Sequence, residues 1–139
     1  MNKKIITVLS VVFSLLVITW SGCKKDNGPQ VEEFTIQIDS IVHPDTINFG
    51  EKLSIKFYGL VGPNGCYEFD RLVPEYFSEV NELAVECLGI HTFNDVCTEI
   101  LVYMDGQELL VSDVPAGSLI IKGIQPDGSV ISQTVFVKE

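Results

Sequence analysis

Apolar and polar residues alternate along most of the chain after residue 33, and a period of two is typical of half-buried β-strands. The alternation is clearest over residues 34–38 and 53–57, where Phe or aliphatic side chains occupy every second position. Each of these segments therefore predicts a strand with one buried face. Similar patterns predict further strands at residues 66–72, 83–90, 100–104, 119–124 and 130–137.

Turn-forming residues separate the predicted strands. Asp105-Gly106 and Asp127-Gly128 are dipeptides typical of tight hairpins, because both residue types tolerate a positive φ. Other turn clusters lie at residues 43–45, 49–51, 62–65 and 115–117. Short strands with turns at this spacing predict an all-β chain, folded as a single antiparallel β-sandwich of about 7–9 short strands over residues 33–139.

One segment has a second interpretation, because its apolar residues also fit the spacing of a helix. These residues are Tyr76, Phe77, Val80, Leu83 and Ala84. A helix over residues 75–87 therefore remains an alternative to the strand at residues 83–90.

The first 23 residues have the features of a secretory signal. Lys3 and Lys4 precede an uncharged stretch at residues 5–20, which is shorter than the roughly 20 apolar residues of a membrane-spanning helix. The following Ser21-Gly22-Cys23 resembles the lipobox of bacterial lipoproteins. The resemblance implies cleavage before Cys23 and a diacylglycerol on its thiol, with an ordinary signal peptide or an anchor helix as the alternative.

The signal also predicts where the protein is found and how it is attached. Residues 1–22 are the expected signal peptide, and residues 23–32 are a flexible tether that begins at the lipidated Cys23. Lys24-Lys25-Asp26 is similar to the start of Bacteroidetes-like lipoproteins. The resemblance implies a lipid-anchored protein of the bacterial outer membrane, either periplasmic or surface-exposed, with the membrane as a partner through Cys23.

Charge limits the other partners. The formal net charge is −10, and without residues 1–22 it becomes −12, with seven Lys and Arg residues against 19 Asp and Glu residues. Binding to nucleic acid requires clustered cations, so we expect no nucleic-acid partner. We expect a monomeric domain with a solvated acidic surface, whose partner is an envelope protein or a glycan.

Two blocks of sequence resemble uncharacterised immunoglobulin-like lipoprotein domains. One is Gly62-Pro63-Asn64-Gly65-Cys66-Tyr67-Glu68-Phe69-Asp70-Arg71, with Cys97 before a Leu-Val-Tyr strand. The other is the C-terminal segment at residues 115–138, from Pro-Ala-Gly-Ser-Leu-Ile-Ile-Lys to Val-Phe-Val-Lys. The resemblance implies an immunoglobulin-like fold over residues 33–139 and carries no activity with it.

Three cysteines follow Cys23, in a compartment that permits disulfides. Cys87 shares a strand face with apolar residues at every second position, which indicates a buried thiol. We therefore predict a disulfide between Cys66 and Cys97. The alternatives are three reduced thiols, or a zinc site formed by Cys87, His91 and Cys97, which the irregular spacing disfavours.

Recognisable catalytic motifs are missing from the sequence, including G-x-S-x-G, H-E-x-x-H and a P-loop. We therefore expect no catalytic residue, cofactor or metal, and a non-catalytic interaction or envelope-structural module. The alternative is a surface hydrolase or sugar-acting enzyme that uses clustered carboxylates. The candidates for that chemistry are the carboxylate pairs Glu32-Glu33, Glu68/Asp70 and Glu82/Glu86, with His43 or His91 as a base. A deep cleft that holds Glu68, Asp70 or His91 would favour the enzyme.

Two predicted loops, at residues 62–65 and 88–95, are the candidate partner-binding surface, because recognition residues concentrate in loops. Asn64, His91 and Phe93 are the residues that we expect to contact a partner. Of the loop aromatics Tyr76, Phe77 and Phe93, we expect at least two to pack in the core.

Two short triplets resemble the O-glycosylation site of Bacteroidetes proteins. They are Asp39-Ser40-Ile41 and Asp45-Thr46-Ile47. The resemblance implies that Ser40 and Thr46 are candidate sites of glycan attachment.

Overall fold

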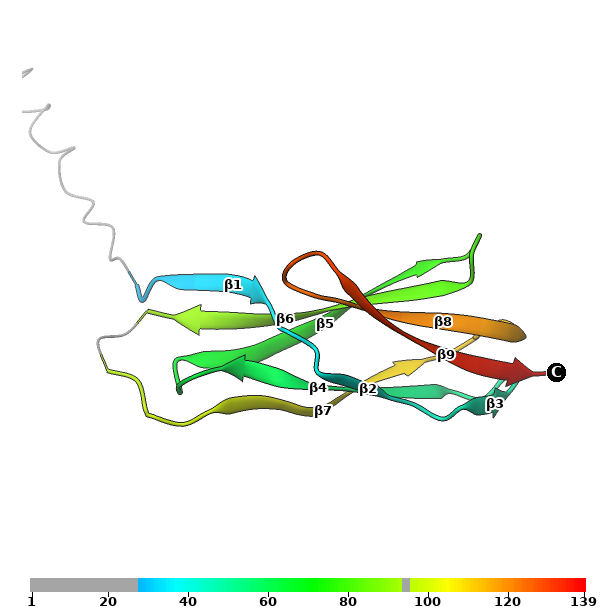
Figure 1. Ribbon diagram of the computed structural model, residues 1–139, viewed down its shortest axis with the longest axis horizontal. Coiled ribbons are helices and arrows are strands. Elements are labelled where there is room, and N and C mark those ends of the chain that lie inside the picture. Colours follow the sequence, from blue (N-terminus) through cyan, green and yellow to red (C-terminus); the bar gives the residue numbers. More distant parts are fainter. Residues whose placement is uncertain (1–27, 94–95) are drawn as a thin grey trace, which may run out of the picture.

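The computed structural model describes residues 28–93 and 96–139 as two β-sheets packed face to face (Figure 1). The strands are β1 (Val31–Thr35), β2 (Ser40–Val42), β3 (Thr46–Asn48), β4 (Leu53–Gly62), β5 (Tyr67–Phe77), β6 (Glu82–Thr92), β7 (Val102–Val111), β8 (Gly117–Ile124) and β9 (Val130–Lys138). The described residues contain no helix. The predicted all-β sandwich is therefore confirmed, and the alternative helix over residues 75–87 is wrong.

The larger sheet is organised around β6. One edge of β6 pairs with β5 over residues 82–91. The other edge pairs with β8 over residues 82–86 and with β1 over residues 88–92, so β1 and β8 lie end to end beside the same strand. Next to β8 come β9 and then β3.

The smaller sheet has the order β2-β4-β7. The chain changes sheet between β1 and β2, between β2 and β3, and again on either side of β4 and β7. These crossovers make two strand pairs parallel, β3 with β9 and β6 with β8, while the other pairs are antiparallel. The sandwich is therefore mixed and not purely antiparallel as predicted, since a crossover allows neighbouring strands to run in the same direction.

Gly106 forms a bulge in the middle of β7. Phe57 pairs with Gln107 and Tyr58 pairs with Asp105, which leaves Gly106 as an extra residue with a φ of 72°. The hairpin turn predicted at Asp105-Gly106 is therefore wrong, and β7 continues to Val111. A glycine with a positive φ occurs in bulges as well as in hairpin turns, so the Asp-Gly dipeptide alone does not distinguish the two structures.

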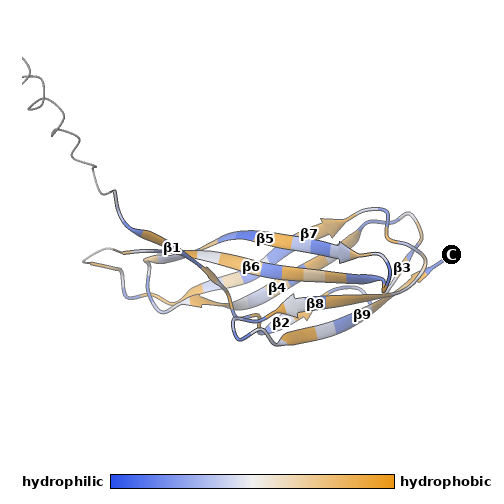
Figure 2. Ribbon diagram, turned by 90° about the horizontal axis from the view of Figure 1, so that it is seen from above, coloured by the Kyte–Doolittle hydropathy of each residue, from blue (hydrophilic) through white to orange (hydrophobic). Residues whose placement is uncertain are grey.

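The core lies between the two sheets and uses the alternate residues that the sequence pattern selects. Leu53, Ile55 and Phe57 of β4 are each 0% exposed, and hydrophobic and hydrophilic positions alternate along the strands in Figure 2. Ile36 and Ile38 are also buried, although they lie in the link between β1 and β2. The fold begins slightly earlier than predicted, because Val31 already pairs with Thr92.

Candidate functional site

A disulfide between Cys66 and Cys97 joins the loop after β4 to the loop after β6. The two Cα atoms are 5.4 Å apart, and the predicted pairing is confirmed. Backbone hydrogen bonds support the link, since Gly65 N donates to Thr98 O at 2.8 Å and Thr92 N donates to Cys66 O at 2.9 Å. We call residues 62–66, 91–93 and 96–101 the disulfide-bonded end.

Cys87 is the free cysteine of the described residues, and it is fully buried in the core. Burial raises the pKa of the Cys87 thiol to about 12, because the thiolate would be desolvated there. The alternative zinc site is wrong, since Cys97 is oxidised and Cys87 is in the core. Residues 28–93 and 96–139 hold no cluster of His, Cys, Asp and Glu suited to a metal ion.

An aromatic row runs across the larger sheet to the disulfide-bonded end. His91 stacks on Tyr67, with ring centroids 4.1 Å apart and planes 8° apart. Phe93 contacts the ring of His91, with a centroid distance of 4.4 Å. Phe34 meets Tyr67 edge to face at 5.6 Å. These four residues come from β1, β5, β6 and the residue after β6, and they form the aromatic row.

Two glycines make space for the aromatic row. A Cβ on Gly62 would lie 2.2 Å from Cγ of Tyr67, and a Cβ on Gly89 would lie 2.7 Å from Cζ of Phe34. Any side chain at either position would collide with a ring. The position of the row therefore depends on the local sequence of four strands, β1, β4, β5 and β6.

The structure brings the predicted partner-binding residues to the same end. His91 and Phe93 are in contact within the aromatic row, and Phe93 is 44% exposed. Asn64 shapes the adjacent turn, since its Oδ1 accepts from Cys66 N at 3.0 Å and its backbone O accepts from Tyr67 N at 3.2 Å. A hollow of about 140 Å³ next to this turn is lined by Gly65, Cys66, Tyr67, Glu68 and Thr92.

The second predicted loop is shorter than expected. Residues 88–92 belong to β6, where they pair with β1 and β5, and only Phe93 of the described part of that segment follows the strand. His91 is therefore a strand residue whose ring is fixed by its neighbours. Period-two alternation could not set this boundary, because alternation is weak in a strand with both faces buried, and β6 buries Val85 and Cys87 on one face and Ala84 and Leu88 on the other.

The candidate carboxylates do not converge on His91. Glu68 is exposed and occupies the position next to Tyr67, so it lies on the opposite face of β5 from the aromatic row. Arg71 forms salt bridges with Asp70 and with Glu33, the latter at 2.7 Å. Glu33 holds the pKa of the Arg71 guanidinium above its ordinary value. Asp70 and Glu33 are therefore paired with Arg71 on an exposed surface.

Tyr76 and Phe77 are 47% and 43% exposed, so with Phe93 all three loop aromatics lie at the surface. The expectation that at least two would pack in the core is wrong. Because β5 is the outer strand of the larger sheet, the side chains at its far end have β6 as their neighbour on one side only. The sequence pattern alone does not show which strand is at an edge.

The candidate modification sites are accessible. Ser40 and Thr46 are exposed in β2 and β3, while the following Ile41 and Ile47 are buried. Their glycosylation stays a prediction. Cys23, the predicted lipid attachment site, lies outside the described residues.

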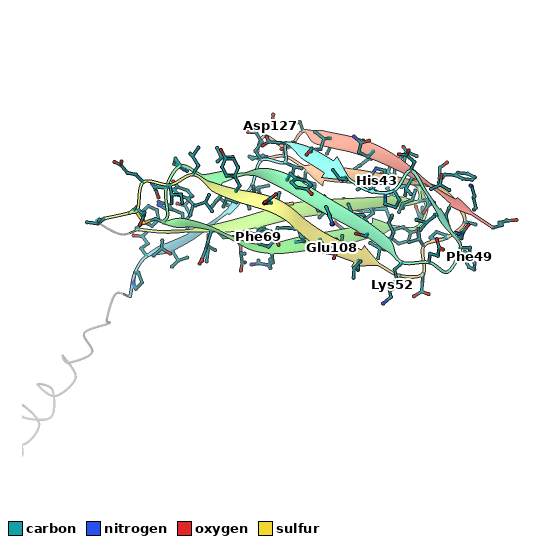
Figure 3. The ribbon with its side chains drawn as sticks, turned by 90° about the horizontal axis from the view of Figure 1, so that it is seen from below. His43, Phe49, Lys52, Phe69, Glu108 and Asp127 are labelled. Atoms are coloured by element: carbon teal, nitrogen blue, oxygen red, sulfur yellow. A yellow bond between two sulfur atoms is a disulfide. The ribbon has the colours of Figure 1, made fainter. Side chains whose placement is uncertain are left out.

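Sequence reasoning missed a second hollow, of about 310 Å³, beside the turn between β8 and β9. Asp127 lies in this turn (Figure 3), and its Oδ1 accepts from Ser129 N at 2.9 Å and from Ser129 Oγ at 2.6 Å. Ser129 thereby holds the pKa of Asp127 below its ordinary value. The turn predicted at Asp127-Gly128 is present. The Asp127 carboxylate accepts hydrogen bonds from Ser129 within this turn.

Within residues 28–93 and 96–139, no helix is long and apolar enough to span a membrane. Comparison with protein-family models, curated proteins and solved structures found no match to this chain.

Proposed function

We propose that this chain is a membrane-anchored, non-catalytic lipoprotein that presents an immunoglobulin-like interaction or envelope-structural module. Cys23 is the lipid-attached residue, and the bacterial outer membrane is the site of attachment. The module acts by surface contact through the disulfide-bonded end. Its contact residues are Asn64, His91 and Phe93.

The aromatic row at the disulfide-bonded end is the observation that carries this proposal. Tyr67, His91 and Phe93 form a continuous ring surface that ends in the half-exposed Phe93. Rings held by their neighbours lose little conformational entropy on binding, which makes aromatic residues frequent at the centre of interfaces. The disulfide and the glycines fix the rings before any partner arrives.

In-cell photo-cross-linking tests the proposal. A photo-reactive amino acid replaces Phe93 in the full-length chain, and a matched variant carries it at Phe49, which is 63% exposed and lies at the opposite end of the sandwich (Figure 3). We expect position 93 to form a defined adduct with an envelope component and position 49 to form none. Equal labelling from both positions would contradict the proposed contact end.

The non-catalytic part of the proposal has its own test. We expect the purified protein to hydrolyse no ester, glycoside or peptide substrate in a way that depends on Glu68 or His91. A turnover that Glu68→Gln or His91→Ala abolishes, in variants that keep the wild-type melting temperature, would show the alternative enzyme to be correct.

A further inference from the structure

We infer that the partner of the disulfide-bonded end is the lipid bilayer, and that the apolar side chains of the loop after β6 enter the headgroup region of zwitterionic phospholipid. The inference rests on the proposed attachment at Cys23 and names the partner of the same end. It assigns a contact role to Val96, Ile100 and Leu101, which the sequence did not single out.

These residues are large apolar residues that one loop leaves exposed. Val96 is 88% exposed, Ile100 is 59% exposed and Leu101 is 52% exposed. A soluble domain seldom leaves large aliphatic side chains grouped in water unless they meet an apolar partner. Further exposed apolar residues surround the same end, namely Val31, Leu60, Phe93 and Tyr103.

The loop is held so that these side chains stay at the surface. The disulfide fixes Cys97, and Thr98 O accepts from both Gly65 N at 2.8 Å and Ile100 N at 2.9 Å. The disulfide and these hydrogen bonds therefore hold residues 97–100 at the end of the sandwich, outside the core cluster. A fixed, projecting aliphatic loop is suited to shallow insertion in a bilayer.

The start of the fold lies against this loop. Phe93 N donates to Gln30 O at 2.9 Å, and β1 begins at the next residue, at the end of the sandwich that also carries the loop after β6 (Figure 1). Gln30 lies seven positions after Cys23, and even a fully extended segment of that length spans at most about 25 Å.

The opposite end is farther from the proposed anchor. β6 has 11 residues, and a strand of that length is about 35 Å long. An anchor at Cys23 therefore limits how far the disulfide-bonded end can lie from the bilayer, whereas the β5–β6 turn can lie the length of β6 farther away. This geometry favours lipid over a soluble partner as the occupant of the apolar loop.

Charge favours neutral lipid. Residues 96–101 contain one ionisable group, Glu99, and no Lys or Arg. Glu32, Glu33 and Glu68 are nearby exposed acids on the strands of the same end. Anionic headgroups are attracted by clusters of basic residues, which this end lacks. Contact should therefore depend on apolar burial and should not increase with anionic lipid.

Tryptophan fluorescence tests the inference, because removing the signal removes Trp20, the single tryptophan of the chain. The full-length protein is produced with its own signal, extracted from membranes and reconstituted in phosphatidylcholine vesicles that contain brominated lipid. Val96→Trp places the probe in the loop. Val80→Trp is the matched control, since Val80 is 58% exposed in the turn between β5 and β6. The unsubstituted protein gives the background.

We expect bromine quenching and a blue shift for Val96→Trp and neither change for Val80→Trp. Adding Ile100→Asp and Leu101→Asp to Val96→Trp should lower the quenched fraction severalfold, because carboxylates are costly to bury in lipid. Replacing a third of the phosphatidylcholine with phosphatidylglycerol should not increase quenching. Equal emission from Val96→Trp and Val80→Trp would overturn the inference.

Mass spectrometry of the same samples separates this inference from the proposed anchor. An acylated protein whose Val96→Trp probe is not quenched overturns lipid contact and leaves the anchor intact. An unacylated protein whose probe is quenched overturns the anchor and supports lipid contact by the loop. A photo-cross-link from position 96 to a protein or to a second copy, without quenching, shows that the occupant is protein and overturns the inference.

Discussion

The side-chain amide of Gln125 pairs with the backbone of Ile38 in both directions. Ile38 N donates to Oε1 of Gln125 at 3.0 Å, and Nε2 of Gln125 donates to Ile38 O at 2.9 Å. Ile38 is 2% exposed and lies in the link between β1 and β2, where no strand pairs with it. The amide thus satisfies two buried backbone groups at the point where the chain changes sheet.

Replacing Gln125 with Ala should lower the free energy of unfolding by about 1–3 kcal/mol, because buried backbone groups lose their partners. Urea denaturation followed by circular dichroism measures this change. The matched control is Gln133→Ala in β9, where the glutamine is exposed, with an expected change within about 0.5 kcal/mol. Equal stability of the two variants would show that water replaces the amide at Ile38.

Much of the sandwich follows from local pattern, and the rest depends on contacts between distant segments. Alternation predicts β4 because Leu53, Ile55 and Phe57 face the core, and the phase of β6 predicts that Cys87 is buried. β2 and β3 have three residues each, which is too short for periodicity to be seen. The pairing of Gln125 with Ile38 spans 87 positions and has no local signal.

In the candidate site too, local pattern predicts some features and contacts between distant segments determine the others. Strand phase was sufficient to choose Cys66 and Cys97 as the disulfide. Contact between His91, Tyr67 and Phe93 depends on the register of β5 against β6, which alternation does not determine. Val96 is exposed beside the disulfide, and the hydropathy of this residue alone does not predict its exposure.

Removing the disulfide should destabilise the domain. The bond joins residues 31 positions apart. In the chain-entropy model, closing a loop of that length lowers the entropy of the unfolded chain and raises its free energy by about 3–4 kcal/mol. We expect the Cys66→Ser/Cys97→Ser variant to lose a similar amount in chemical denaturation. Peptide mapping of the unreduced wild-type protein provides the control, and a bridge that contains Cys87 would contradict the assignment.

Stability should fall at alkaline pH because of Cys87. The folded pKa of its thiol is about 12, whereas an unfolded cysteine has a pKa of about 8.5. Below about pH 8.5 both states hold the proton and the thiol adds no pH dependence. Between about pH 8.5 and pH 12 the unfolded state releases the proton first, so this group lowers stability by up to about 1.4 kcal/mol per pH unit.

Denaturation curves of the wild type and of Cys87→Ala, collected from pH 7 to pH 11, isolate this effect. The two proteins share every ionisable side chain except that of Cys87, so the difference between the two curves belongs to Cys87. We expect the wild type to lose stability more steeply than Cys87→Ala above about pH 8.5. Parallel curves would mean that the thiol ionises in the folded state without cost.

The mass of the mature N-terminus tests the central claim, attachment of the module at Cys23, most directly. Intact-protein and peptide mass spectrometry of full-length protein extracted from bacterial membranes should find a chain that begins at Cys23 and carries a diacylglyceryl adduct. Cys23→Ser should lose the adduct and keep the melting temperature of the folded domain. A chain that retains Met1, or one that begins elsewhere without lipid, would contradict the claim.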